Sequence, residues 1–583
     1  MRRQPNSRKW KLMLNNLKKN LMKSYRLRYW IYCMQVFIPF FLIVQETGAQ
    51  EIKKEVFVVK PYEPALSDAS KIGYMPSVED METTIPAFTY KIKPTPIETL
   101  FEVIPIRPAK MVSSSLPRIY NTYLKIGLGN YITPLAEFNI SNLHSKDYAI
   151  GAYLYHKSSH SGIRLGNDDK VPSGCAVSNV NLYGKKFFDN MTLTGNITLD
   201  HEGFNYYGYN THLFDLDSLP AMDHGDIHQR TILLGAQAGV HSTYTDSSHL
   251  NYKLSVRYNY LTDNSDNTEN MVFIITSFSQ LIRTFMGGIS LNINYFKPDI
   301  SMDSVGNTQF YFSPYISKRN EDWKFVVGFD GVIDQEEVSR FYLYPRGLLE
   351  FTVIEKIMIP FIGIGGKLET NHYQKIIREN HFITPGLKVK NTHHKLIAFA
   401  GIKGSISPEL AFRADVSYST AENMYFFVND TTTPLQNTFG VNYDEVDILH
   451  YHGELAAEPS SHWNVIASFN YYSYSMFEEK KPWHKPQFDL TLNAVYNLKE
   501  KFLISGELDV IGQRFAKSSV TIIPEGFLKL ETVADINLGF EYLFSKLFTV
   551  FIDICNITGR SYMLWNQYPS QRFNFLIGFT YKL

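Results

Sequence analysis

The sequence predicts an all-β protein, a transmembrane antiparallel β-barrel of about 22 strands, with about 20 to 22 favoured and about 16 to 18 as the lower alternative. Three observations lead to this prediction. From Tyr120 onward, segments that alternate apolar and polar residues follow one another to Leu583. Aromatic residues make up 15% of the chain, including 38 Tyr and 41 Phe, and barrels use such residues where the wall meets water. No internal run reaches the roughly 18 apolar residues of a membrane-spanning helix.

The alternation is regular enough to assign two faces to each strand. Apolar residues occupy alternate positions, opposite polar ones, in residues 191–200, 252–260, 289–295, 487–496 and 530–542. A soluble β-sandwich would show the same alternation, so this pattern alone leaves both architectures open. The export signal, the number of strands and the last strand favour the membrane barrel, with lipid outside and a wet lumen inside.

The last strand, residues 573–583, has the strongest pattern. One face is apolar and aromatic, and it consists of Phe573, Phe575, Ile577, Phe579, Tyr581 and Leu583. The other face is mostly small or polar. A strand in a bilayer needs about 9–11 residues of this pattern. Because a closed barrel pairs its last strand with its first, we expect this segment to be the barrel-closing strand.

The N-terminus has the three parts of a secretory signal in residues 1–49. A basic stretch precedes the apolar run Tyr29–Val44, and small residues before Gln50 offer a cleavage site; Met1 and Met22 both stay open as the start. The whole chain has 57 basic and 57 acidic residues, and removal of the signal takes away ten bases and one acid, which leaves 47 and 56. An acidic mature chain indicates no nucleic-acid partner.

Residues 50–119 differ from the rest because they contain nine prolines, which disfavour long strands and helices. We interpret this segment as an extended periplasmic or lumen-filling arm that precedes a barrel of residues 120–583. Within the arm, a short β-prone run follows an acidic residue: Glu55, Val56, Phe57, Val58 and Val59. Such a run could add a strand to a partner protein, and a plain extended segment is the alternative.

The connections between strands predict the orientation of the barrel. Short turns alternate with long connections, the latter near residues 157–174, 204–227, 369–393, 420–445, 515–528 and 556–570. Outer-membrane barrels keep their periplasmic turns short and their extracellular loops long. Trp323 and Trp463 follow two short turns and are expected in the periplasmic aromatic girdle. We expect Trp483 and Trp565, in loops, in the outer girdle, with ligand binding as the alternative.

The sequence contains few candidates for catalytic or metal-binding residues. His156 and His160 flank two serines without an acid nearby, which predicts no hydrolase and no enzyme. Acidic residues at Asp263, Asp266 and Glu269, and again between 215 and 226, have the oxygen ligands that calcium prefers but lack the spacing of a calcium loop. We interpret both stretches as solvated acidic loops, with loop calcium as the alternative, and expect no cofactor.

The end of the chain resembles the TonB-dependent receptor family. The resemblance rests on Asp553–Ile557, then Tyr562, Trp565, Tyr568–Pro569 and Arg572 before the last strand. The final residue, Leu583, replaces the family's usual Phe. The aromatic-rich barrel suggests a Bacteroidota-type relative. The resemblance implies a bacterial outer-membrane location, and it makes residues 55–59 similar to the segment that binds the periplasmic energy-coupling protein TonB. The family's plug domain does not fit in residues 50–119.

Two functions stay open at this stage. The first is solute transport or a channel, with the N-terminal arm acting as a reduced plug. The second is a structural barrel subunit of an outer-membrane complex for assembly, secretion or surface lipoproteins, with a blocked lumen. The expected partners are outer-membrane lipid and either the periplasmic energy-coupling protein or other outer-membrane proteins and lipoproteins.

Overall fold

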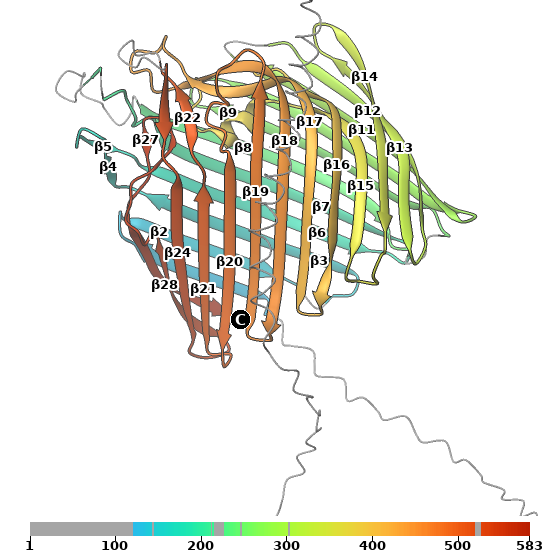
Figure 1. The fold of residues 1–583 in the computed structure, drawn as a ribbon. Helices are drawn as coiled ribbons and strands as arrows, with labels where there is room; N and C mark the ends of the chain where they lie inside the picture. The colour runs from blue at the N-terminus through green and yellow to red at the C-terminus, as the bar shows by residue number, and fades with distance from the viewer. Residues whose placement is uncertain are drawn as a thin grey trace, which may run out of the picture. The chain divides into compact units, whose positions relative to one another are not determined.

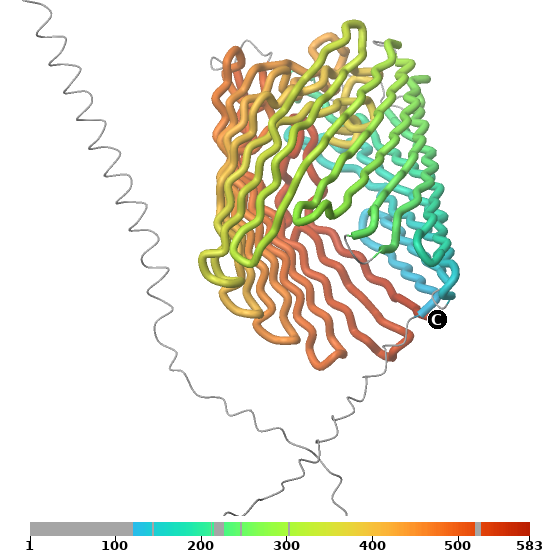
Figure 2. Tube along the Cα trace, turned by 90° about the vertical axis from the view of Figure 1, so that its right-hand side faces the viewer, coloured from blue at the N-terminus to red at the C-terminus, as the bar shows by residue number. Residues whose placement is uncertain are grey.

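The computed structural model describes residues 120–583 except 143–144, 212, 215–226, 245–247, 301–303 and 519–525. Within this part of the chain, 22 strands form one antiparallel sheet that closes into a barrel (Figures 1 and 2). The predicted signal, the arm and its run Glu55–Val59 lie outside the described residues. No helix of the described part is long and apolar enough to span a membrane.

Each strand of the wall pairs with the next one along the chain. The wall strands are β1 (Thr122–Gly129), β2 (Thr133–Ser141), β3 (Tyr148–Ser159), β6 (Cys175–Phe187), β7 (Met191–Asn205), β8 (His228–Ser242), β9 (Asn251–Asp263), β10 (Thr268–Ile282), β11 (Phe285–Asp299), β12 (Asn307–Arg319), β13 (Trp323–Gln335), β14 (Ser339–Phe351), β15 (Ile359–Glu369), β16 (Thr392–Ser407), β17 (Leu410–Asn429), β18 (Phe439–Ser460), β19 (Trp463–Met476), β20 (Phe488–Leu498), β21 (Phe502–Ile511), β24 (Val533–Leu543), β25 (Phe548–Cys555) and β28 (Asn574–Lys582). The connections contain β4 (Gly162–Arg164), β5 (Lys170–Pro172), α3 (Tyr373–Glu379), β22 (Arg514–Lys517), β23 (Phe527–Leu530), β26 (Met563–Trp565) and β27 (Tyr568–Pro569).

The last strand closes the barrel, as the sequence predicts. β28 pairs antiparallel with both β25 and β1, and Thr122 and Leu583 exchange two backbone hydrogen bonds of 3.0 Å. Inside this seam, the ring of Phe551 lies against Gly127 and Gly578. A Cβ atom on Gly578 would lie 2.7 Å from this ring, so only glycine fits there.

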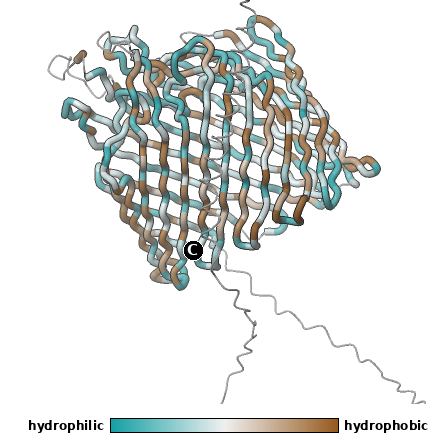
Figure 3. Tube along the Cα trace, in the orientation of Figure 1, coloured by the Kyte–Doolittle hydropathy of each residue, from teal (hydrophilic) through white to brown (hydrophobic). Residues whose placement is uncertain are grey.

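The two faces of the wall carry different side chains. Apolar residues of every second position face outward, and they are exposed; Ile197 is 54% exposed and Leu343 is 60% exposed. Figure 3 shows apolar and polar positions alternating along the strands. A closed sheet with an apolar exterior is a membrane barrel, and the described residues do not form the two stacked sheets of a sandwich.

The two ends of the barrel differ, and we call them the outer end and the inner end. Long connections lie at the outer end and short turns at the inner end, where Trp323 and Trp463 begin β13 and β19 as predicted (Figure 1). One predicted connection, 420–445, is wrong. β17 and β18 continue through most of it, because a bulge at Ala421/Met424, where Asn423 has φ 54°, absorbs the polar residues that interrupt the alternation.

Candidate functional site

A buried apolar cluster crosses the lumen at the outer end. Its members come from opposite parts of the wall, β7 to β11 on one side and β17 to β18 on the other, and from connections that fold inward between them. The cluster consists of Phe204, Tyr206, Leu233, Leu261, Met271, Phe296, Ile300, Tyr373, Ile376, Ile377, Ile383, Leu387, Val389, Tyr425, Phe427, Phe439 and Tyr568. Because one buried cluster joins opposite walls, the chain itself fills the outer mouth of the barrel.

The largest contribution comes from residues 370–391, which connect β15 to β16 and contain α3; we call them the inner loop. Ile376 and Ile383 of this loop are fully buried. Ile383 forms a parallel bridge to Phe439 at the start of β18, and its carbonyl accepts a 2.6 Å hydrogen bond from the hydroxyl of Tyr206. The inner loop therefore contacts both walls through backbone groups as well as side chains.

Glu269 of β10 holds the first turn of α3. Its carboxylate accepts hydrogen bonds from the backbone N–H groups of Tyr373 at 3.0 Å and Gln374 at 2.9 Å, and it lies 3.3 Å from His372 Nδ1. An acid at a helix N-terminus satisfies donors that the helix leaves unpaired. Asp263 accepts a 2.7 Å hydrogen bond from the Tyr373 hydroxyl.

These contacts correct the interpretation of Asp263 and Glu269 as parts of a solvated acidic loop, whereas Asp266 lies exposed in the turn between them. Glu269 is only 2% exposed, and Asp263 also accepts hydrogen bonds from the backbone of Ser265 and Asn267. In the described residues, no group of three or more His, Cys, Asp or Glu side chains could hold a metal ion. The second acidic stretch, residues 215–226, lies outside the described residues.

Ion pairs surround the apolar contacts of the inner loop. Basic side chains of the loop face carboxylates of the wall and of its outer rim. The ion pairs are Lys375–Glu369 at 2.6 Å, Arg378–Asp200 at 3.0 Å and Lys388–Glu336 at 3.0 Å. His381 Nε2 forms a 3.1 Å hydrogen bond with Glu202, which is an ion pair only when the imidazole is protonated. Such partly exposed pairs are individually weak and sensitive to salt. Together they fix the orientation of the loop over several strands.

A second inward-folded connection, residues 477–487 between β19 and β20, lies beside the inner loop. Asp444 accepts backbone hydrogen bonds from Glu478 and Glu479, and Lys485 pairs with Glu379 of α3 at 2.8 Å. Trp483 is 2% exposed and donates a 2.9 Å hydrogen bond to Glu479. Its predicted place in the outer girdle is therefore wrong, because the loop that carries it turns away from lipid.

His484 in the same connection is buried between Phe427 of β17 and Asn566 of the β26–β27 hairpin. Its Nδ1 donates a 2.9 Å hydrogen bond to the carbonyl of Phe427, and its Nε2 faces the backbone N–H of Asn566 at 3.4 Å. Burial lowers the pKa of His484 to about 4, and the nearby positive charges of Arg514 and Lys485 act in the same direction. The imidazole is therefore neutral at neutral pH, with the proton on Nδ1.

The β26–β27 hairpin completes the filling of the mouth. The ring of Tyr568 stacks on Phe382 of the inner loop at 3.5 Å between centroids, and its hydroxyl donates a 2.6 Å hydrogen bond to the carbonyl of Asn437. Trp565 packs edge-on against Phe427 at 5.1 Å. The prediction of an outer girdle is therefore wrong for Trp565 too. The sequence singled out Trp565 and Tyr568 through a resemblance but gave no sign that they lie inside.

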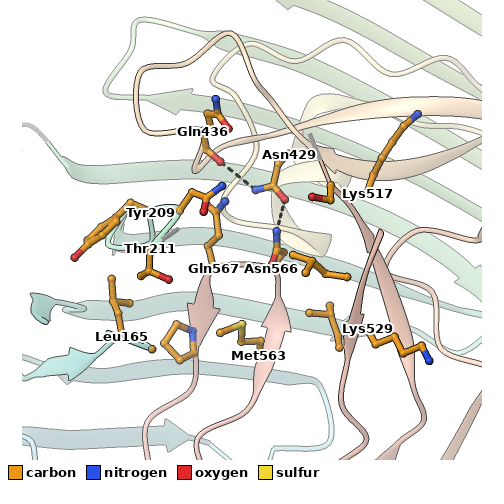
Figure 4. A pocket seen from close by; sticks show the side chains of 16 residues that line it. Leu165, Tyr209, Thr211, Asn429, Gln436, Lys517, Lys529, Met563, Asn566 and Gln567 are labelled. Carbon is orange, nitrogen blue, oxygen red and sulfur yellow. Dashed lines mark hydrogen bonds between the residues drawn. The ribbon is translucent and has the colours of Figure 1, made fainter. Parts of the chain in front are cut away.

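A cavity of about 230 Å³ opens between these connections (Figure 4). It lies beside the hairpin tip and is lined from several connections, by Leu165, Gly166, Tyr209, Asn210, Thr211, Asn429, Gln436, Lys517, Ser518, Leu528, Lys529, Leu530, Met563, Asn566, Gln567 and Pro569. None of these residues is among the predicted site residues. The predicted closing strand forms wall, and its apolar face points to lipid rather than into a site.

The Ser-rich stretch with two histidines is also resolved. The Oγ atom of Ser158 lies 3.1 Å from Nε2 of His160, whereas Nδ1 of His156 is hydrogen-bonded to the Ser178 hydroxyl on β6. The described residues place no carboxylate in hydrogen-bond contact with His160. The arrangement therefore lacks the acid that would orient a catalytic histidine.

No family model and no curated protein matches this sequence. Solved structures do match the fold. The ferric-catecholate import receptor Fiu from E. coli K12 superposes with a TM-score of 0.61 at 11% identity, over 81% of this chain and 83% of that one. The FrpB iron transporter from Neisseria meningitidis gives 0.60 at 10% identity, over 80% and 82%. A mutant of the ferric enterobactin receptor PfeA from Pseudomonas aeruginosa, in complex with enterobactin, gives 0.58 at 9% identity, over 80% and 82%.

At these identities the similarity shows the fold alone. The chain is a closed 22-strand antiparallel barrel that is structurally similar to TonB-dependent siderophore receptors. A barrel of this kind indicates the bacterial outer membrane. Those receptors belong to a family of transporters without enzymatic activity.

Proposed function

We propose that the protein is a solute receptor and transporter of the outer membrane. In this proposal the solute binds at the outer end of the barrel. The inner loop, residues 370–391, is the gate at that end. Residues 50–119 act as a reduced plug from the periplasmic side. The observation that carries the proposal is the way in which the mouth is filled. The loop that fills it is held at its edges by partly exposed pairs such as Arg378–Asp200, which solvent and salt can reach.

A gate has to leave its closed position at a modest cost. Arg378 is 50% exposed in its pair with Asp200, and His381 is 42% exposed in its pair with Glu202. Pairs this exposed typically contribute about 0–1 kcal/mol each. The buried contacts of Ile376 and Ile383 favour the closed position more strongly, so the closed state is expected to predominate when no solute is bound.

The arm would supply the coupling. Residues Glu55–Val59 would add a strand to the periplasmic energy-coupling protein, and the pull on the arm would open the inner end of the lumen. The Bacteroidota-type origin belongs to the same proposal and rests on the aromatic-rich barrel alone. The three compared receptors are named for iron or ferric siderophores.

Conductance in planar bilayers tests the proposal. The protein without residues 51–115 is expected to open briefly, and more often as KCl rises from 0.1 to 1 M, because the Debye length falls from about 10 Å to about 3 Å. A barrel that stays closed at every salt concentration would contradict the gate.

The second candidate is a structural barrel subunit with a blocked lumen. The filled mouth favours it, since a scaffold needs a sealed lumen and no gate. Gentle solubilisation of membranes that contain the tagged full-length protein distinguishes the two. A stoichiometric outer-membrane partner together with absent conductance would support the scaffold, whereas salt-dependent openings without such a partner would support transport.

A further inference from the structure

One side of the lumenal wall is acidic. In β24, Ile536 and Phe540 point outward and are 37% and 38% exposed, so the alternate residues Asp535 and Glu541 point into the lumen. β21 pairs with β24 and places Asp509 directly opposite Asp535. Two like charges directly opposite each other on one face destabilise a sheet. This side of the wall therefore calls for positive charge close to it.

Three carboxylates on these two strands form no ion pair in the described part of the barrel. They are Glu507, Asp509 and Glu541, and we call them the acidic face; nearby, Asp553 lies 3.8 Å from Lys125. Glu507 is exposed and Glu541 is half-buried, so both carboxylates can be reached from the lumen. A cation that enters the lumen can therefore contact the acidic face.

The wall across the lumen treats its carboxylates differently. Glu350 of β14 lies 3.4 Å from Lys324 of β13 and 2.8 Å from Lys403 of β16. Asp330 of β13 lies 3.6 Å from Arg346 of β14. Each of these lumenal carboxylates thus has a basic partner on its own or a neighbouring strand. The missing cations are a property of the acidic face and not of the whole lumen.

The rest of the barrel sequence cannot supply these cations. The internal segments outside the described residues contain no Lys and no Arg. The other lysines and arginines of the chain precede Tyr120, and those before Gln50 belong to the predicted signal. Residues 103–119 contain Arg107, Lys110 and Arg118 but neither Asp nor Glu. This stretch has the charge that complements the acidic face.

The same stretch is long enough to reach the acidic face. It leads directly into β1, which starts at the inner end of the barrel. The 14 residues from Arg107 to Asn121 span up to about 45 Å when extended. β21 lies four strands from β1, about 19 Å around the wall, and Glu507 lies five residues, about 17 Å, from the inner end of β21. The distance to be covered is shorter than the tether.

We infer that residues 107–118 of this chain dock on the lumenal face of β21 and β24, where Arg107 and Lys110 supply the positive charge that the acidic face lacks. The inference deepens the proposed function, because it gives the reduced plug a defined place on the wall. It rests on the part of that proposal in which residues 50–119 enter the lumen.

Disulfide cross-linking in the full-length protein tests this docking. In a background of Cys175→Ser and Cys555→Ser, Ala109→Cys is combined with Ser505→Cys, on the lumenal face of β21, or with Ser277→Cys, on the lumenal face of β10. β10 is eleven strands from β21 in the ring of 22, so it lies on the opposite side. Under mild oxidation we expect the 109–505 pair to cross-link about ten-fold or more faster than the 109–277 pair. Equal rates, or a faster 109–277 pair, would overturn the inference.

Neutral variants show whether charge holds the segment. Glu507→Gln with Asp509→Asn should slow the 109–505 cross-link about ten-fold, since two ion pairs are lost. Glu350→Gln with Asp330→Asn removes two carboxylates from the other wall and is the matched control, which should leave the rate unchanged. Heat-modifiable migration on gels verifies that each variant is folded. An unchanged rate in the Glu507→Gln, Asp509→Asn protein would exclude the acidic face as the docking surface.

Exchange of the charges gives the sharper test. Glu507→Lys with Asp509→Lys should slow the cross-link more than the neutral variant does. The further changes Arg107→Glu and Lys110→Glu should return the rate to within about three-fold of the native charges. Failure of this second pair of changes to restore the cross-link would show that the acidic face attracts mobile cations rather than residues 107–118.

The two outcomes of cross-linking and conductance separate this inference from the proposed function. A 109–505 cross-link in a barrel that never conducts without residues 51–115 would contradict transport and leave the docking intact. Salt-dependent openings of that shortened protein, together with no preference for position 505 in the full-length one, would contradict the docking and leave transport intact.

Discussion

The outer and inner ends of this barrel share the same strands but differ in the connections between them. At the inner end, turns such as 408–409 and 461–462 only reverse the chain. At the outer end, the inner loop and its neighbours fold into the lumen and bury Ile376, Ile383 and Trp483 almost completely. Few apolar side chains are buried toward the inner end of the described barrel, Phe361 among them. The wall is held by its backbone ladder and by the lipid against its apolar exterior, so buried apolar packing marks the place where the lumen is closed.

The largest effect is expected from a charge placed in the filled outer end. Ile376→Asp would bury a carboxylate in an apolar cluster without a partner, which costs several kcal/mol, about 3–5. The inner loop should leave the lumen while the barrel remains folded. Conductance of the protein without residues 51–115 should rise more than about ten-fold. Thr431→Asp, on an exposed connection at the same end, is the control and should change nothing. A closed Ile376→Asp barrel would mean that this cluster does not close the mouth.

At one height in the wall, the effect of a substitution should depend on the face that it occupies. Ile197 and Thr198 are neighbours in the middle of β7, and only Ile197 faces lipid. Ile197→Arg is expected to destabilise the barrel by about 2–4 kcal/mol near the bilayer midplane. Thr198→Arg places the same charge in the lumen and should cost far less. Urea unfolding in lipid vesicles measures both, and equal losses would contradict the assignment of the two faces.

As the pH falls, the buried contacts around His484 at the outer end should weaken before the wall of the barrel unfolds. The pKa of His484 is about 4 in the folded protein against 6.5 in the unfolded chain, so the unfolded chain binds more protons between these values. The contribution of His484 to stability is therefore complete above pH 6.5 and falls as the pH drops toward 4, by roughly 3 kcal/mol.

Hydrogen exchange of the amides of Phe427 and Asn566 between pH 7 and 4, corrected for intrinsic rates, measures this effect. His484→Gln keeps a polar side chain without the titration and should remove most of the difference, while other histidines and carboxylates still titrate. An identical pH response in native and His484→Gln proteins would show that another group loosens this end.

The smallest effect concerns the ion pair between Arg378 of the inner loop and Asp200 of β7. Arg378→Asp should repel Asp200 and weaken the closed position by about 0.5–1 kcal/mol. The reversed pair, Asp200→Arg with Arg378→Asp, should restore the native open probability at low salt. At 1 M KCl the native, single and reversed proteins should converge. A single variant that differs as much at high salt as at low salt would exclude an ion pair as the cause.

The wall could be predicted from the sequence because the alternation within each strand shows which residues face lipid and which face the lumen. Ile197 and Thr198 differ in polarity at the period of two that a strand imposes, and Phe575 and Ile577 repeat that pattern at the closing strand. The connection 420–445 was the exception, since Glu422 and Asn423 interrupt the alternation and only the structure shows the bulge.

The filled mouth could not be predicted, because its contacts join residues far apart in the chain. Glu269 gains its role from the start of α3, more than a hundred residues later. Trp483 has the composition of a girdle residue, and no local period distinguishes a loop that turns inward from one that spreads over lipid. The helix α3 has seven residues, which is too short for a helical period to be visible.

The labelling of single cysteines on intact cells tests the closure of the mouth most directly. In a protein with Cys175→Ser and Cys555→Ser, a cysteine at position 376 is compared with one at position 431 for reaction with an impermeant maleimide added outside. If the inner loop fills the lumen, position 431 reacts at least about a hundred-fold faster than position 376, as the free energy needed to expose a buried isoleucine requires. Equal labelling rates at the two positions would show that the outer mouth is open and that the inner loop is not its gate.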